Sequence, residues 1–83
     1  MNRADIYDAI TAHRAVQAEK WGGAHDWGSG DCSSAKVRPE VKAAVLAEEC
    51  GEVARAVLDK DRDNLRAELV QVAAVAVAWL EAL

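Results

Sequence analysis

Residues 39–80, PEVKAAVLAEECGEVARAVLDKDRDNLRAELVQVAAVAVAWL, carry the pattern that decides the fold. Two long apolar runs flank the charged segment Asp59–Asp63, and the only proline is Pro39, which suits the first turn of a helix. Either Asp61 or Asp63 can cap the next helix, which we expect to run from about Arg62 to the end of the chain. The stretch therefore predicts two antiparallel helices in a hairpin that turns near Lys60.

The second helix of this hairpin is apolar on nearly every side. From Leu69 to Leu80 only Gln71 interrupts the apolar residues. A helix that is apolar all round must be covered all round, and the helices of one short chain can hardly do that. Moreover, a chain of 83 residues buries only about 60–65% of its unfolded surface. We therefore expect a second copy of the chain to complete the core.

The N-terminal part predicts one further helix and one loop. Residues 4–21 show helical spacing of apolar side chains without an internal glycine or proline, and Gly22-Gly23 ends that helix. Residues 22–36 contain four of the five glycines, together with His25 and Trp27, which either close over a ligand or have a structural role. The expected fold is a single all-α domain over residues 1–83, an antiparallel bundle of about three helices completed by dimerisation.

Charge and composition exclude several classes of protein. The net charge is −4, and no cluster of lysine and arginine stands out, which argues against nucleic-acid binding. The longest apolar stretch, Val72 to Leu80, is shorter than the ~20 residues of a membrane helix, and the N-terminus lacks the apolar core of a signal peptide. Cys32 and Cys50 lack metal-site spacing and fit a reducing compartment. We expect a cytoplasmic protein without membrane or nucleic-acid partners.

The segment Glu48-Glu49-Cys50-Gly51-Glu52 breaks two local rules of helix stability. At ~100° per residue its three carboxylates fall within about a quarter turn, and like charges at this spacing destabilise a helix. Gly51 inside the helix costs about 1 kcal/mol relative to alanine. Local rules are commonly broken at functional sites.

The hairpin brings oxygen ligands from both helices to the same level. With the turn at Lys60, Glu52 lies opposite Glu68 and Glu49 lies opposite Gln71. Oxygen-only ligands in apolar surroundings suit a hard cation, Mg²⁺ or alternatively Mn²⁺. The competing interpretation is a solvated acidic stripe on a surface helix.

This pattern resembles the all-α nucleoside triphosphate pyrophosphatase superfamily and, within it, the MazG-like group. The signature of that group is Glu-Glu-x-x-Glu on one helix and Glu-x-x-Asp on the next. Its first half is complete in Glu48–Glu52, and its second half stands in Glu68–Gln71 with Gln71 in the aspartate position. The segments Arg14–Gln17 and Lys20–Gly22 also resemble the opening of small members of the group.

The resemblance implies Mg²⁺-dependent hydrolysis of a nucleoside triphosphate (NTP) or deoxynucleoside triphosphate (dNTP) to the monophosphate and pyrophosphate, as in house-cleaning of nucleotide pools. It also implies a helical dimer or a dimer of dimers. Its metal ligands map onto Glu49, Glu52 and Glu68, with Gln71 replacing a fourth carboxylate. Glu48 is left to orient the attacking water or to bind a second metal ion.

The first helix offers candidates for substrate binding. Trp21 either stacks on a nucleobase or covers the end of the bundle. Arg14 and Lys20 are candidates to hold phosphate or sugar oxygens, and Gln17 lies on the same broad face. The alternative function is a non-catalytic helical dimer that binds a nucleotide or serves as an interaction module, and Gln71 is the residue that favours it.

Overall fold

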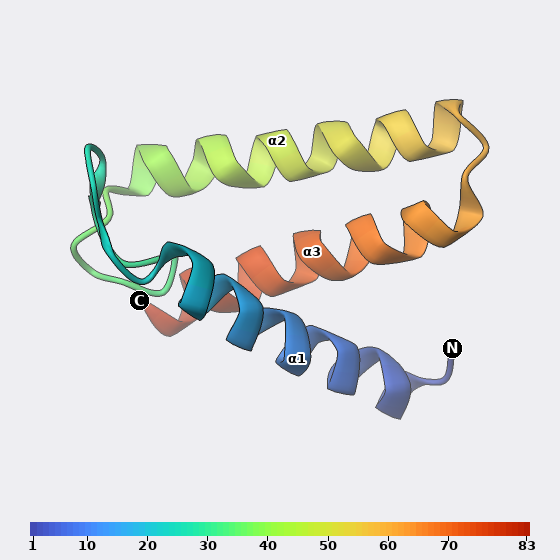
Figure 1. The fold of residues 1–83 in the computed structure, drawn as a ribbon, viewed down its shortest axis with the longest axis horizontal. Coiled ribbons are helices and arrows are strands. Elements are labelled where there is room, and N and C mark those ends of the chain that lie inside the picture. Colours follow the sequence, from blue (N-terminus) through green and yellow to red (C-terminus); the bar gives the residue numbers. More distant parts are fainter.

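The computed structural model describes all residues, 1–83, and confirms the prediction of three helices (Figure 1). In chain order the elements are α1 (Arg3–Trp21), β1 (Ala24–His25), β2 (Gly28–Ser29), α2 (Pro39–Leu58) and α3 (Arg62–Glu81). None of the helices combines the length and the apolar character that crossing a membrane requires. Both cysteines are free.

The ends of the helices follow from local capping. The side chain of Asn2 accepts a hydrogen bond from the backbone N–H of Asp5 at 2.8 Å and caps α1. At the start of α3, Asp61 accepts from the N–H of Asn64 at 3.1 Å, so Asp61 rather than Asp63 is the capping residue. The turn between α2 and α3 lies at Lys60, as the sequence predicted, and Lys60 adopts a left-handed conformation there (φ 55°).

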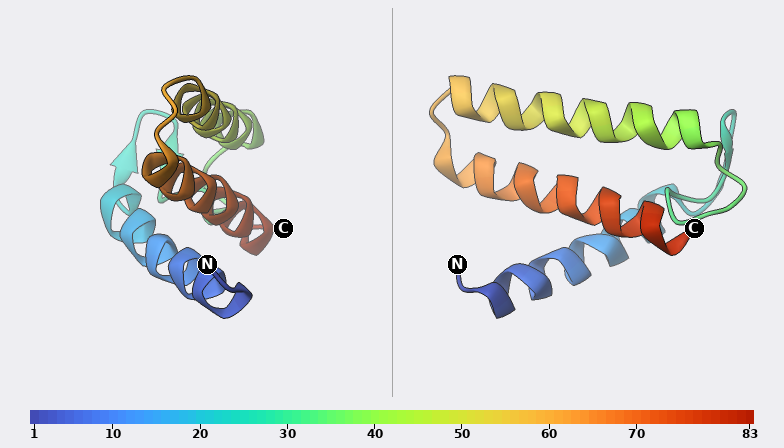
Figure 2. Two further views of the ribbon diagram at one scale, coloured as in Figure 1. Left: turned by 90° about the vertical axis from the view of Figure 1, so that its right-hand side faces the viewer. Right: turned by 180° about the vertical axis from the view of Figure 1, so that it is seen from behind.

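The helices form an open layer, not a closed bundle. The predicted antiparallel hairpin is present in α2 and α3, and α1 lies on the other side of α3 and runs in the same direction as α3 (Figures 1 and 2). Helix α3 packs against both other helices, whereas α1 and α2 make little contact with each other. Helix α3 is thus the middle of the layer, and the loop that follows α1 crosses to the start of α2 at one end of the layer (Figure 1).

Small residues make up the core. The buried apolar residues are Val37, Ala56, Ala74, Val75 and Ala78, and no large side chain is fully buried. Several larger residues of α3 are exposed instead, among them Leu69 at 51% and Leu80 at 68%. This exposure agrees with the expectation that α3 has more apolar surface than one chain can cover.

A short β-hairpin lies within the loop that the sequence predicted over residues 22–36. Ala24 pairs with Ser29 and His25 with Gly28 in antiparallel register. Gly28 has a φ of 140°, and a Cβ there would collide with the carbonyl oxygen of Lys36. Two-residue strands are too short to show an alternating pattern, which is why the sequence indicated only a loop.

Candidate metal and nucleotide site

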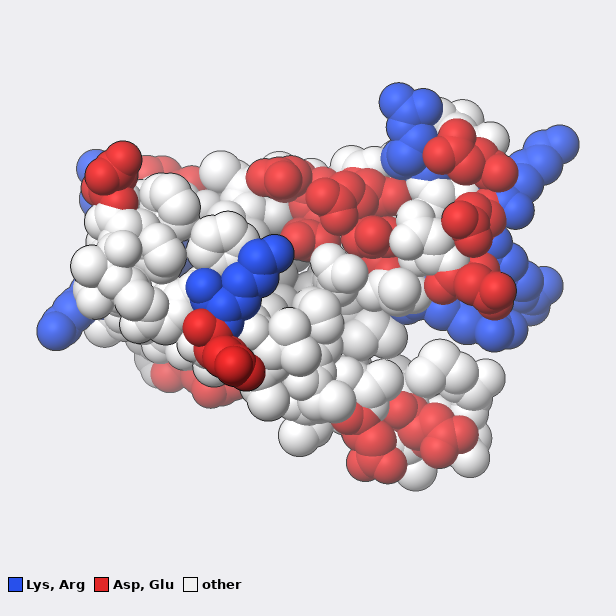
Figure 3. All heavy atoms as spheres, in the orientation of Figure 1, with Lys and Arg blue, Asp and Glu red and all other residues white.

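Three carboxylates converge between α2 and α3. Glu49 and Glu52 come from α2 and Glu68 comes from α3, and each offers an oxygen such that all three oxygens lie within 4.8 Å of one another. The spacing of i and i+3 on α2 and the register of the hairpin produce this convergence. Figure 3 shows the acidic side chains that gather over the middle of α2, the stretch that contains both glutamates.

The electrostatics of the cluster favour a bound cation. Glu49 Oε2 and Glu68 Oε2 are buried and have no hydrogen-bond partner. Burial first, and then the negative charges of Glu52, Glu68 and Glu48, raises the pKa of Glu49 to about 7. Burial and the adjacent carboxyl of Glu52 likewise raise the pKa of Glu68.

No basic side chain neutralises these carboxylates. Arg55, the arginine of α2 nearest in sequence, lies 4.0 Å from Asp59 instead, and both of these side chains are exposed. Buried carboxylate oxygens without partners are costly, and a hard divalent cation removes that cost. The donor set therefore fits Mg²⁺ or Mn²⁺.

A cavity of about 820 Å³ lies beside the carboxylates, within the size range of small-molecule sites. It is bounded by α1, the loop, α2 and α3. Among the residues that line it are most of those singled out from the sequence: Gln17, Lys20, Trp21, Glu48, Glu49, Glu52, Glu68 and Gln71. Residues that are far apart in the sequence thus line a single cavity.

An aromatic cluster borders the same cavity. Trp21 and Trp27 both line it, with ring centroids 6.2 Å apart and tilted by 56°. His25 stacks on Trp27 with centroids 4.6 Å apart and an interplanar angle of 7°, and its Nε2 lies 2.9 Å from the carbonyl oxygen of Trp21. Lys20 Nζ lies 5.1 Å from the centroid of the Trp21 ring. For Trp27 the sequence left two alternatives open, closing over a ligand or a structural role, and its place in the glycine-rich loop was the signal for both.

Arg14, a candidate for substrate binding, is not among the residues that line the cavity, and its contact with substrate stays a prediction. Its Nη1 donates to Asp31 at 2.9 Å and to the Gln17 amide oxygen at 3.0 Å, and its Nε donates to Glu81 at 3.1 Å. Only 13% of the side chain is exposed. Two of these partners, Gln17 and Asp31, line the cavity, so Arg14 positions Gln17 and links α1 to the loop and to the end of α3.

The fold and the carboxylate centre define a class: an all-α protein with acidic residues facing one another across an antiparallel helical hairpin. The chain belongs to the family of the MazG nucleotide pyrophosphohydrolase domain, whose family model matches residues 38–81. The matched part is α2, the turn and α3, which together carry all three converging glutamates. No curated protein and no solved structure matches the chain significantly.

Proposed function

We propose that the protein hydrolyses an NTP or dNTP between the α- and β-phosphates, with Mg²⁺ or alternatively Mn²⁺ as the required ion. The observation that carries this proposal is the convergence of Glu49, Glu52 and Glu68, with two buried oxygens lacking partners, beside a cavity of nucleotide size. Family membership supplies the reaction type, pyrophosphohydrolysis. The proposed cellular role is removal of unwanted nucleotides.

The three glutamates would each supply one carboxylate oxygen to the ion, and Gln71 its amide oxygen. When bound, Mg²⁺ supplies charge neutralisation on phosphate oxygens and a lowered pKa for bound water. Gln71 contributes no charge, so only the three glutamate ligands would offset the positive charge of the ion. Glu48, which is exposed and lines the same cavity, would orient the attacking water and accept its proton.

The aromatic side of the cavity would hold the nucleoside. Trp21 and Trp27 are 41% and 38% exposed, which leaves ring surface for a base to cover. Lys20 and Gln17 lie on the same side of α1 and both line the cavity, where their nitrogen atoms can donate to sugar and phosphate oxygens.

The test is a panel of NTPs and dNTPs incubated with the protein and Mg²⁺, with pyrophosphate and monophosphate measured as products. We expect stoichiometric release of both from at least one nucleotide, and no release after chelation of the ion. Inorganic phosphate as the product, or no product from any nucleotide, would contradict the proposal.

A second candidate function, a nucleotide-binding helical dimer without catalysis, is favoured by Gln71 alone. The variant Gln71→Asp separates the two functions because it restores a fourth carboxylate. Under the enzymatic proposal the wild type already releases pyrophosphate and Gln71→Asp tightens Mg²⁺ binding in calorimetry. Nucleotide binding by the wild type without turnover, together with turnover in Gln71→Asp, would favour the second function.

We also propose that the working form is a homodimer, or a dimer of dimers. The open layer of helices and the exposed apolar residues of α3 support this assembly.

A further inference from the structure

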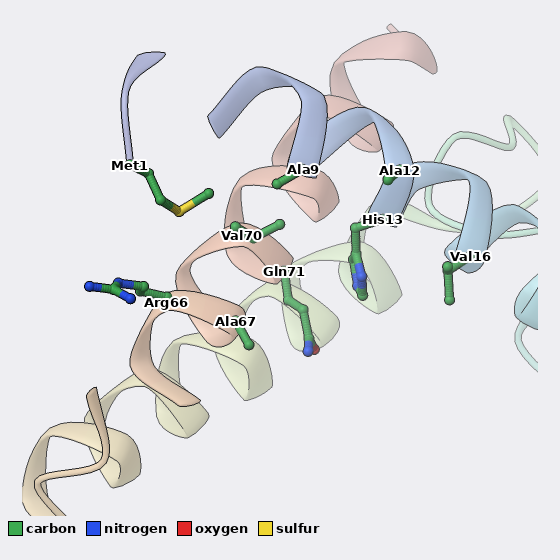
Figure 4. Close-up of a pocket in the computed structure, with 9 residues that line it drawn as sticks. All are labelled: Met1, Ala9, Ala12, His13, Val16, Arg66, Ala67, Val70 and Gln71. Carbon is green, nitrogen blue, oxygen red and sulfur yellow. The ribbon is translucent and has the colours of Figure 1, made fainter. Parts of the chain in front are cut away.

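His13 occupies a shared wall between two cavities. It lies on α1, half-buried, and lines both the carboxylate cavity and a second, more open cavity of about 440 Å³ between α1 and α3. Gln71 of α3 lines the same two cavities. Figure 4 shows the imidazole of His13 and the amide of Gln71 extending in the same direction from their two helices.

The ring of His13 makes no hydrogen bond and no ion pair, whereas His25, the only other histidine, is stacked on Trp27 and in contact with the Trp21 carbonyl. Its ring nitrogens therefore remain available to a ligand. A neutral imidazole offers one N–H donor and an imidazolium offers two.

Basic groups are scarce around the carboxylate cavity. Six acidic residues line it (Asp31, Glu40, Glu48, Glu49, Glu52 and Glu68), whereas its basic residues are only His13 and Lys20. Lys20 lies over the Trp21 ring, and His13 precedes Lys20 by seven positions, a separation of about 10 Å along a helix. If the nucleobase of a substrate stacks on the tryptophans, its triphosphate extends away from Lys20, and His13 is the hydrogen-bond donor near the terminal phosphates.

We propose that His13 donates a hydrogen bond to the β- or γ-phosphate of the substrate, the part that leaves as pyrophosphate. The inference rests on the proposed function, since it requires a triphosphate in the carboxylate cavity. The neutral amide of Gln71 beside this position lets a phosphate oxygen approach without repulsion from a fourth carboxylate. Because the contact is to phosphates that a monophosphate lacks, His13 favours substrate over nucleotide product.

The experiment compares His13→Ala and His13→Gln with wild type and with the control Glu19→Gln, an exposed residue of α1 outside both cavities. Calorimetry measures the binding of α,β-imido nucleoside triphosphates, carrying each DNA base in turn, and of the matching monophosphates, in the presence of Mg²⁺. Mn²⁺ affinity is measured on the nucleotide-free proteins, and circular dichroism verifies folding.

We expect His13→Ala to weaken triphosphate binding about tenfold, the effect of one charge-assisted hydrogen bond. Monophosphate binding and Mn²⁺ affinity should change less than twofold. His13→Gln keeps a neutral N–H donor and similar bulk, so it should fold like wild type and recover part of the lost affinity. Glu19→Gln should match wild type throughout.

Three results would overturn the role of His13 alone, while pyrophosphate release by the wild type persists: unchanged triphosphate affinity in both variants, an equal loss for mono- and triphosphate, or a loss of Mn²⁺ affinity. A wild-type protein that neither binds triphosphates nor releases pyrophosphate would instead overturn the proposed function, and this inference with it.

Discussion

At the scale of single residues, the three glutamates of the cluster differ in how far their carboxylates are exposed to solvent. Glu49 and Glu68 each have one oxygen buried without a partner, whereas Glu52 is exposed. Without a cation these carboxylates repel one another, so the arrangement that would bind an ion also destabilises the folded state. Function and stability therefore respond in opposite directions to the loss of a carboxylate.

The substitution Glu52→Gln tests this opposition. Pyrophosphate release should fall at least about 100-fold because an ion ligand is lost. The melting temperature in the presence of a chelator should stay the same or rise, since one source of like-charge repulsion has been removed. Thermal denaturation and product assays on the same preparation check both, with Glu19→Gln as the matched change of charge. A lowered melting temperature without metal would mean that Glu52 is a structural residue.

The raised pKa of Glu49 predicts that the folded state without metal loses stability as the pH rises. A carboxyl whose pKa is about 7 when folded, against an ordinary 4.5, binds its proton more tightly in the folded state. Its contribution to stability is complete below pH 4.5 and is lost as the pH rises through about 7, and Glu68 acts in the same direction. The lowered pKa of Asp31 matters only in more acidic solution, below its ordinary value of 3.8.

Melting temperatures in chelator should therefore fall between pH 5 and pH 7.5, and the stabilisation by added Mg²⁺ should grow over the same range as the carboxylates lose their protons. Thermal denaturation at four or five pH values, with and without Mg²⁺, measures both trends. Stability in chelator that rises towards pH 7.5 would contradict the burial of these charges.

At the scale of secondary-structure elements, the features that could be predicted from the sequence are those that follow from the spacing of residues along a helix. The hairpin of α2 and α3 and the meeting of Glu52 with Glu68 follow from helical periodicity and one turn. The partners of Arg14 could not be predicted, because Asp31 and Glu81 lie 17 and 67 residues away in the chain. Lys42 is another example: it is only 3% exposed, without hydrogen bond or ion pair, and no local pattern marks it as buried.

The contacts of Arg14 should contribute unequally to stability. The Asp31 carboxylate is 8% exposed and Glu81 is 53% exposed. We expect Arg14→Ala to lower the free energy of unfolding by about 2 kcal/mol, because Asp31 loses a charged partner while shielded from water. Glu81→Gln, which affects the same arginine from an exposed position, should cost less than about 1 kcal/mol. Urea denaturation measures both variants, and equal losses would contradict this ranking.

At the scale of the whole molecule, the chain exposes more surface than its size warrants. The accessible surface is 5638 Å², against about 4,800 Å² for a folded chain of this size. The excess, roughly 800 Å², equals what one partner buries in a protein–protein interface of standard size. A second copy over the exposed residues of α3 would bring the surface back to the usual value.

The predicted consequence is that folding and assembly are coupled. Sedimentation at low micromolar concentration should show no folded monomer, and the melting temperature should rise with protein concentration. Leu80→Glu, at a site 68% exposed in the single chain, should leave an isolated chain unaffected but disrupt a dimer formed over α3. A compact monomer whose melting temperature does not depend on concentration would remove the argument for a partner.

The pair of tilted indoles beside the cavity also makes the protein its own optical probe. Two of the three tryptophans, Trp21 and Trp27, line the cavity with their centroids 6.2 Å apart, where a base would stack. A stacked nucleobase should quench their fluorescence and alter the near-ultraviolet circular dichroism of the coupled rings. Nucleotide entry can then be followed in real time without a label, and Trp79, which does not line the cavity, provides the residual signal.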